Sequence, residues 1–447
     1  MFSYLATLIL LGAAPPCGPL DVDTAVVLAA ERSDEVAIKQ AELAAAHADE
    51  ALARALRYIP MATATVTTGP APEAHGDILH SEQTNRSLGG LAPFGRIDVQ
   101  VVQPLYTWGR LDAASEAADA GTKARQELMI DTVGQVQLRV TQLFWGVAVA
   151  KRLLGISADV EKALQEADKR ISDSLKSGDG EVSPADKFRV DLFRSVLRGR
   201  EAEAEKGLDL ARIGLAATLR LPPAKLVLKD EPLDPVEGEV PDTATVLAAA
   251  ERQRPDLRAL DEGIRAREAE VKSEQAAMKP QFFVTGLFGY AYAPNRTIQY
   301  NPWVSDPFNF LTVGAAIGVR QDLAFPTLSA RARKAIAEKA ILDRQRAGLA
   351  RLVQVQVDSA LADLRAARAR LVAARAALGS GKSLFRSVGL DFAAGLIEAR
   401  DLIESYTMYV ESQVGAAQAA YDFVVSEARL AQVAGEPPRK GSRCELE

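Results

Sequence analysis

The sequence predicts a mainly α-helical protein with a small β part, in which one helix–strand–strand–helix unit occurs twice. Three observations support this fold class. A short sequence recurs after about 220 residues. Four short segments alternate apolar and polar side chains, and each half of the chain carries a helical pattern of roughly 70 residues.

The duplication is visible where each copy begins. Residues 23–30 are DTAVVLAA and residues 242–249 are DTATVLAA. Each copy continues as an Ala-, Glu- and Arg-rich helix that ends at a proline, Pro60 or Pro280. The predicted organisation is a signal peptide or N-terminal segment (1–20), a first repeat (21–235), a second repeat (236–433) and a disordered C-terminal tail (434–447).

Four segments keep the two-residue period of a β-strand. Across residues 311–319 the side chains Leu, Val, Ala, Ile and Val face one way, and smaller or polar residues face the other. Residues 97–101 and the run 282–292 alternate similarly, while 62–67 is the weakest of the four. Two-faced strands that end in aromatic residues are typical of transmembrane β-barrels. A soluble sandwich would need further strands, which the rest of the sequence does not provide.

The strand count predicts oligomerisation. The smallest single-chain barrels have about eight strands, so four strands cannot close a barrel alone. Strand edges in lipid must be paired. Two chains would supply about eight strands and three chains about twelve.

The helical patterns differ in length. One pattern runs from Trp108 to Leu175, about 68 residues or roughly 100 Å, with coiled-coil spacing of its apolar residues. Two shorter helices flank it, at 22–58 and 184–219, and the second copy repeats this at 242–279 and 397–433. Two short helices stacked end to end would match one long helix. The Lys-, Asp- and Pro-rich segment 222–240, here called the equatorial segment, would lie where they meet.

Composition argues against an enzyme. The net charge of −6 is small and mixed, which excludes a nucleic-acid partner. Cys17 and Cys444 lie near the termini, and only three histidines occur. His75 and His80 fall in a Gly-rich loop between the first two strands, where surface positions are favoured over metal ligation. No catalytic triad, metal-ligand spacing or phosphate-binding loop is present, so we expect no catalysis, cofactor or metal site.

The N-terminus resembles a signal peptide. An apolar run of about 13 residues is too short to span a bilayer and is followed by small residues. Because the usual basic residues are missing, the true start and cleavage site stay open. Pro15 and Pro16 precede Cys17, where a lipoprotein signal needs small residues, so an unmodified cysteine is favoured over a lipidated one.

Three short motifs strengthen the interpretation. They are RPDLRAL at 254–260, VQPLYTWG at 102–109, and a glycine followed six residues later by aspartate in both helical hairpins. With the duplicated architecture, they make nearly the whole mature chain resemble the TolC-like outer-membrane efflux family. The resemblance implies a homotrimer with a 12-stranded transmembrane β-barrel, four strands per chain, continued by an antiparallel coiled-coil tunnel.

The same resemblance implies a function. The chain would be the outer-membrane exit duct of a tripartite efflux pump or type I secretion system, extending into the periplasm. Its partners would be outer-membrane lipid, a periplasmic adaptor (membrane fusion protein) and an inner-membrane pump of the RND, ABC or MFS type. The cargo, whether drug, metal ion or polypeptide, and the particular pump stay open. The alternative is a soluble periplasmic coiled-coil structural protein.

The resemblance also implies a gate at the hairpin ends. Gly180 and Gly395 would be turn glycines at adaptor-docking tips. Asp401 would line the constriction and Glu404 would follow one turn later, together forming an acidic ring. In the alternative, Asp401 is a solvated acid that suits the start of the last helix.

Two further expectations concern packing. In the family, a tyrosine and an arginine near the second glycine reach the aspartate that corresponds to Asp186. Phe392 and Ile397 occupy those positions here, so either apolar packing of Phe392, Leu396 and Ile397 holds the tip or these residues form the adaptor's docking surface. At the other end of the long helix, Tyr106 and Trp108 would be membrane-interface anchors.

Overall fold

The chain folds into two compact units. The computed structural model describes residues 18–76, 85–177, 184–236, 238–299, 301, 303–394, 396–397 and 399–439. Unit 1 comprises Met1–Glu42, Gln126–Ala259 and Arg346–Glu447, and unit 2 comprises Leu43–Arg125 and Leu260–Gln345. Cys17, Cys444, His80, Gly180 and Gly395 lie outside the described residues.

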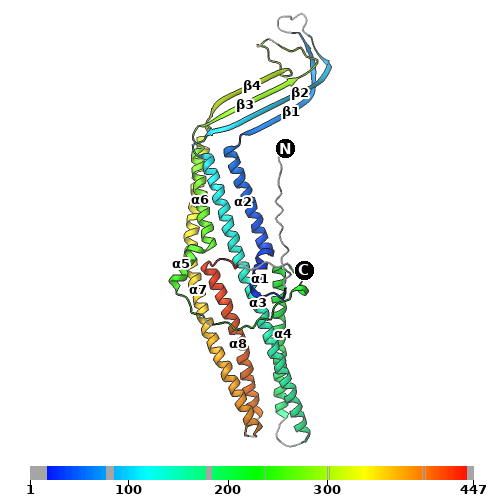
Figure 1. Ribbon diagram of the computed structural model, residues 1–447, viewed down its shortest axis with the longest axis vertical. Helices are drawn as coiled ribbons and strands as arrows, with labels where there is room; N and C mark the ends of the chain where they lie inside the picture. Colours follow the sequence, from blue (N-terminus) through cyan, green and yellow to red (C-terminus); the bar gives the residue numbers. More distant parts are fainter. Residues whose placement is uncertain are drawn as a thin grey trace. The chain divides into compact units, whose positions relative to one another are not determined.

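Unit 2 contains an antiparallel sheet with the strand order β1-β2-β3-β4 (Figure 1). The four predicted strands are confirmed, and most extend beyond the alternating segments. Their bounds are Met61–His75 for β1, Asn85–Tyr106 for β2, Gln281–Tyr292 for β3 and Phe310–Arg320 for β4.

Pairing explains why β1 is longer than its local pattern. Its Ala-, Thr- and Pro-rich sequence has weak strand propensity, but β2 supplies a continuous partner from Met61↔Val102 to Ala71↔Ala92. The placement of His75 in a loop is wrong, because His75 ends β1. Its Nε2 lies 2.7 Å from Glu73 Oε1, a contact within one strand.

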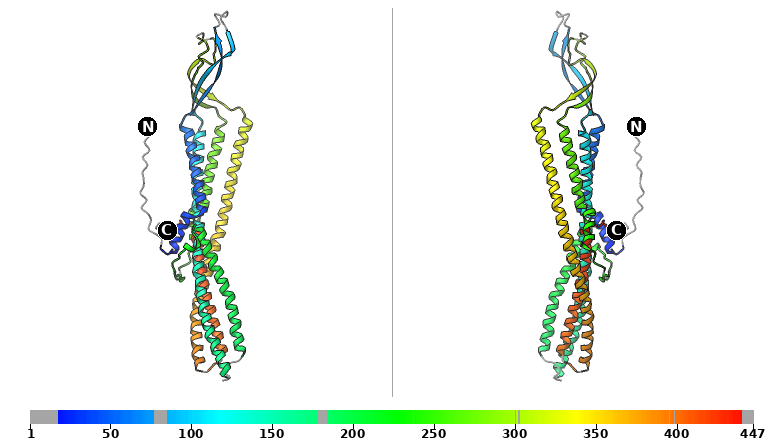
Figure 2. Two further views of the ribbon diagram at one scale, coloured as in Figure 1. Left: turned by 90° about the vertical axis from the view of Figure 1, so that its right-hand side faces the viewer. Right: turned by 90° about the vertical axis from the view of Figure 1, so that its left-hand side faces the viewer.

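Unit 1 is built from two helical pairs. Helix α3 (Arg110–Ser177) runs beside α4 (Pro184–Thr218), and α7 (Phe325–Ala393) runs beside α8 (Ala399–Ala434) (Figure 2). The predicted long helices are confirmed at 68 and 69 residues. None of the helices in the described part of the chain combines the length and apolar character needed to cross a bilayer.

Apolar side chains at three- and four-residue intervals join these pairs, as the coiled-coil spacing predicts. The core of the second pair holds Val353, Val357, Leu361, Leu364 and Leu371 of α7 with Ala419, Ala420 and Phe423 of α8. In the first pair it holds Ile156, Val160, Leu164 and Ile171 of α3 with Val190 and Leu197 of α4.

Each predicted helix at a repeat start is broken once. Ser33 separates α1 (Val22–Arg32) from α2 (Asp34–Tyr58), and Arg254 separates α5 (Thr243–Gln253) from α6 (Pro255–Ala276). Pro255 accounts for the second break, because its ring clashes with the backbone of the preceding residue, Arg254, in helical geometry. The helices of each repeat meet near these breaks. Leu215 of α4 and Leu219, which follows α4, pack with Val36, and Leu430 and Val433 of α8 pack with Leu257.

Helices α4 and α8 end in the same way. Arg220 and Gly435 follow them in the left-handed region, at φ 53° and 77°. The next amide then reaches back to the last turn, Leu221 N to Ala216 O at 2.9 Å and Glu436 N to Ala431 O at 3.0 Å. Both are Schellman motifs. The 3-10 helix η2 (Pro223–Lys225) follows the first of them.

Arg254 fastens the end of α8 to α7 and α6. Its buried guanidinium donates to both Asp256 oxygens, at 3.1 and 2.6 Å, and to Gln356 Oε1 at 2.7 Å. A further contact reaches Val433 O at 3.4 Å. The backbone of Gly435 lies directly against Arg254, which is why no side chain fits there.

The expectation of a disordered tail from residue 434 is wrong for its first part. Ala434 ends α8, and residues 435–439 lie against α3. Gln137 Nε2 donates to Arg439 O at 3.1 Å, and Arg439 N donates to Gln137 Oε1 at 3.0 Å. These paired bonds hold the end of the second repeat to the first repeat. Residues 440–447 are outside the described part of the chain.

We expect Gly435→Ala to destabilise unit 1 by about 1–3 kcal/mol. The new Cβ would lie 2.7 Å from the backbone nitrogen of Arg254, in addition to the strain of its positive φ. Gly415→Ala is the matched control, because Gly415 lies within α8 with nothing inside 4 Å of the added Cβ. Thermal unfolding of the purified protein measures both variants, and equal melting temperatures would contradict this account.

We also expect Asp131→Asn to raise the melting temperature near neutral pH. Burial, reinforced by the neighbouring Asp256, raises the pKa of Asp131 above its usual 3.8. The folded state therefore binds a proton more tightly than the unfolded chain, and this stabilisation is lost as pH rises through the folded pKa. The advantage of the variant should shrink as the pH falls toward 3.8. A lower melting temperature at neutral pH would contradict the prediction.

Candidate functional site

One face of the sheet is an exposed apolar surface. A row crosses all four strands, from Val66 through Ile97 and Tyr290 to Leu311. The exposed fraction of these side chains is 72% for Val66 and 68% for Leu311. Further exposed members of this face are Phe282, Phe288, Tyr292, Val313, Ile317 and Val319. Soluble monomers rarely expose a continuous apolar surface of this kind, so the face requires an apolar environment.

The opposite face is polar. Arg96 donates from Nε and Nη2 to Asp98, at 2.6 and 2.9 Å, and forms a two-point ion pair along β2. Thr65 lies opposite Asp98 on β1, and Gln100 and Thr312 complete the polar set. A depression of about 400 Å³ lies over these residues. The pattern of alternation therefore separates two chemically distinct faces, as the sequence predicted.

Two aromatic rings lie flat on the polar face. A Cβ on Gly289 would come within 2.9 Å of the Phe310 ring, and one on Gly318 within 2.5 Å of the Phe283 ring. Glycine at these cross-strand positions makes room for the rings. An arginine covers each ring, with the Arg96 guanidinium 5.2 Å from the Phe310 centroid. The sequence alone does not reveal this arrangement, because it depends on the register of β3 and β4: Gly318 lies directly opposite Phe283, whereas Phe310 lies opposite Ala291 and reaches Gly289 diagonally.

Trp108 joins the two repeats at the start of α3. Its backbone has a positive φ of 55°, which is costly for a bulky residue. Three contacts compensate. The indole N–H donates to Pro280 O at 2.6 Å, the ring meets Tyr106 edge-on at 5.0 Å, and Lys279 Nζ lies 5.1 Å from its centroid. Tyr106 and Trp108 are both well exposed, and their role as membrane anchors stays a prediction.

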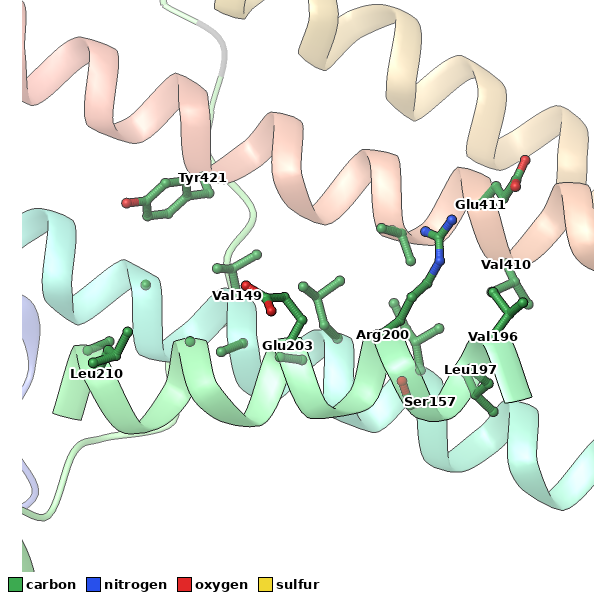
Figure 3. Close-up of a pocket in the computed structure, with 18 of the residues that line it drawn as sticks. Val149, Ser157, Val196, Leu197, Arg200, Glu203, Leu210, Val410, Glu411 and Tyr421 are labelled. Carbon is green, nitrogen blue, oxygen red and sulfur yellow. The ribbon is translucent and has the colours of Figure 1, made fainter. Parts of the chain in front are cut away.

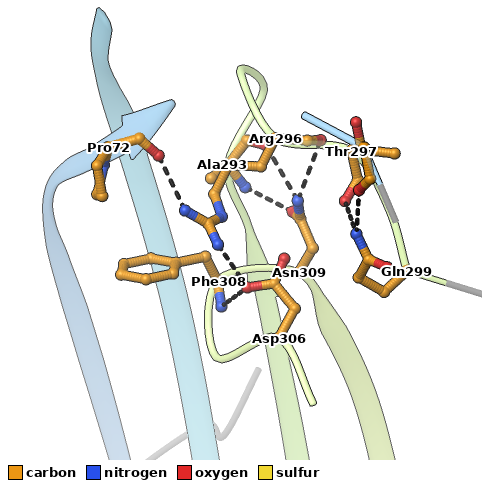
Figure 4. Close-up of polar contacts among 9 residues, drawn as sticks. Pro72, Ala293, Arg296, Thr297, Gln299, Asp306, Phe308 and Asn309 are labelled. Atoms are coloured by element: carbon orange, nitrogen blue, oxygen red, sulfur yellow. Dashed lines mark hydrogen bonds and ion pairs between the residues drawn. The ribbon is translucent and has the colours of Figure 1, made fainter. Parts of the chain in front are cut away.

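The connection between β3 and β4 is fastened to β1 (Figure 4). Arg296 Nη1 donates to Pro72 O at 2.9 Å, and its Nη2 lies 3.3 Å from the buried carboxylate of Asp306. The Phe308 ring packs against the guanidinium at 4.5 Å. Asn309 holds the base of the loop through Ala293, donating to its carbonyl and accepting from its amide. The loop is thus tied across the sheet by polar contacts that composition alone did not suggest.

Unit 1 carries an apolar groove of about 800 Å³ (Figure 3). Its floor is α3 and its walls are α4 and α8, with charged residues such as Glu203 among apolar ones. Figure 3 shows the Arg200 side chain reaching from α4 toward α8, which carries Glu411. Other lining residues include Val149, Val196, Leu197, Leu210 and Val410.

The predicted acidic residues of the tip lie on α8. Asp401 is in the first turn, and both Asp401 and Glu404 are exposed to solvent. Their exposure is compatible with a pore-lining ring and with simple stabilisation of the helix start. Asp186 is different, since only 9% of the residue is exposed and it accepts a bond from Arg189 Nη1 at 2.6 Å.

The residues at the positions of the family's tyrosine and arginine, Phe392 and Ile397, have different surroundings. Phe392 lines a cavity of about 410 Å³ together with Phe385 and Tyr406. Ile397 is partly buried, whereas Leu396 is 73% exposed. Phe392 therefore has aromatic neighbours around a cavity, Leu396 is exposed, and the apolar hold on the tip stays a prediction.

Comparison with known proteins agrees with this arrangement. Residues 246–436 match the family model described as outer membrane efflux protein. No curated protein sequence matches the chain significantly. Several solved structures share the fold: the MtrE outer membrane channel of Neisseria gonorrhoeae has a TM-score of 0.75 at 16% identity, covering 94% of this chain and 90% of that one.

Two other channels give similar values. The CmeC outer membrane channel of Campylobacter jejuni has a TM-score of 0.74 at 14% identity, covering 94% of this chain and 87% of that chain. The outer-membrane channel OprN has a TM-score of 0.74 at 16% identity, covering 94% and 91%. Such low identities establish the fold alone, and the family match is confined to residues 246–436. The chain has the fold of TolC-like outer-membrane channels, and its residues 246–436 match the outer membrane efflux protein family.

Proposed function

We propose that this protein is the outer-membrane exit duct of a tripartite efflux pump or type I secretion system. It acts as a homotrimer whose sheets close into a 12-stranded barrel in the outer membrane, continued by a periplasmic helical tunnel. A periplasmic adaptor and an inner-membrane pump of the RND, ABC or MFS type deliver the cargo.

One observation carries the proposal: an open sheet with an exposed apolar face and a polar face. In the described residues, β1 pairs with β2 and β4 pairs with β3, so one edge of each outer strand lacks a partner within the sheet. Lipid cannot satisfy those backbone groups, whereas strands from neighbouring subunits can. Closure by three chains puts the row of Val66, Ile97 and Leu311 toward lipid and Arg96 and Asp98 toward the lumen.

For the adaptor, we propose the apolar groove between α4 and α8 as the docking surface, together with the hairpin ends. The groove extends along α4 from Phe193 to Ala211, a length suited to a partner helix. Charged side chains such as Arg200 and Glu411 would orient that helix.

At the tip, we propose that Asp401 and Glu404 of three subunits form an acidic ring that favours cations. Asp186, already paired with Arg189, is not required as a latch. Phe392 lines one cavity with Phe385 and Tyr406, and this placement supports an apolar hold on the closed tip.

The placement of the sheet is tested by a pair of adjacent cysteines. Thr65→Cys lies on the polar face and Val66→Cys on the apolar face, in a chain whose Cys17 and Cys444 have been replaced. We expect a charged, membrane-impermeant thiol reagent to label the first and spare the second in intact outer membranes. Equal labelling of both, or recovery of the protein in the soluble periplasmic fraction, would favour the soluble structural alternative.

We expect Asp401→Ala with Glu404→Ala to weaken cation selectivity in planar bilayers. The double variant removes about six carboxylates from the proposed ring of a trimer. A control that removes the exposed Glu205 and Asp209 from α4 deletes the same charge elsewhere. If selectivity and block by divalent cations are unchanged in the tip variant, or change equally in the control, the ring is disproved.

A further inference from the structure

The polar face of the sheet holds charged groups in a fixed arrangement rather than on free side chains. Arg96 and Asp98 are two residues apart on β2, so both project from the same face. Their two hydrogen bonds, at 2.6 and 2.9 Å, match the planar guanidinium to the carboxylate. Each side chain keeps more than a third of its surface exposed, so both remain accessible from the polar depression.

The neighbouring strands hold this pair in place. The Phe310 ring of β4 crosses Gly289 of β3 and packs against the Arg96 guanidinium. A Cβ added at Gly289 would also lie 3.4 Å from Asp98 Oδ1. The glycine, the ring and the ion pair therefore form one layer across three strands, and this layer favours the paired arrangement of the two charges.

We propose that Arg96 and Asp98 set the ion selectivity of the barrel lumen as a charge-balanced ring. This inference rests on the proposed trimeric barrel, in which three pairs would encircle the lumen. Each pair contributes no net charge and therefore favours neither anions nor cations. Loss of one partner leaves a ring of three like charges, which attracts ions of the opposite sign.

The two single variants therefore have opposite expected effects. Asp98→Asn leaves three unpaired guanidinium groups, and the potassium-to-chloride permeability ratio should fall by about threefold. Arg96→Gln leaves three carboxylates, and the ratio should rise by a similar factor. The double variant Arg96→Gln with Asp98→Asn should return close to the original ratio, because the net charge is again unchanged.

The experiment measures reversal potentials in planar bilayers under a potassium chloride gradient. It is run in the otherwise native chain and in the Asp401→Ala, Glu404→Ala background, so that the tip does not mask the barrel. Arg96→Lys is the matched control, because it keeps the charge and loses the two-point geometry. It should retain the original ratio.

The outcomes separate this inference from the proposed function. If no variant and no unmodified protein forms channels, the proposed function fails. If channels form and both single variants keep the original ratio, the barrel stands and the inference is overturned. Shifts of the same sign in both variants would also overturn it, since that result indicates a structural role. Opposite shifts that cancel in the double variant support it.

Discussion

The unpaired edges of the four-stranded sheet are the constraint on which the rest of the molecule depends. Among the described residues, β1 and β4 each lack a neighbouring strand on one side, apart from the bridge of Ala74 with Arg296, and the face they share exposes Val66, Leu311 and Val313. Neither feature is tolerable for an isolated soluble chain. Association with other chains in an apolar environment removes both costs at once. The family match of residues 246–436 and the proposed trimeric state agree with this requirement.

The helical unit is stabilised by different means. Long apolar seams join α3 to α4 and α7 to α8, while single polar residues fix the points where helices end. Arg254 is the clearest case, because its five donors can satisfy a carboxylate, an amide and a carbonyl together. Gln137 acts similarly on the segment that follows α8. Apolar packing sets the direction of the helices, and these buried polar contacts set their register.

The sequence predicted those features that repeat along the chain. Period-2 alternation located β2, β3 and β4, and sustained apolar spacing located α3 and α7, because each signal is summed over many residues. Features that depend on distant partners were not predictable. The left-handed Trp108, the bond from Arg296 to Pro72 and the ordered residues after Gly435 depend on contacts between residues far apart in the sequence. The tip acids were proposed from the family resemblance and remain a prediction.

The pairing of β2 with β3 has a consequence for assembly. These strands come from different repeats, yet they form a ladder from Gly95↔Tyr292 to Tyr106↔Phe282 within one chain. A protein built from single repeats would have to make that junction between separate molecules. Fusing the two copies makes it intramolecular, so a closed ring needs half as many encounters between subunits, and fewer open hairpins are exposed to misassociation while the ring forms.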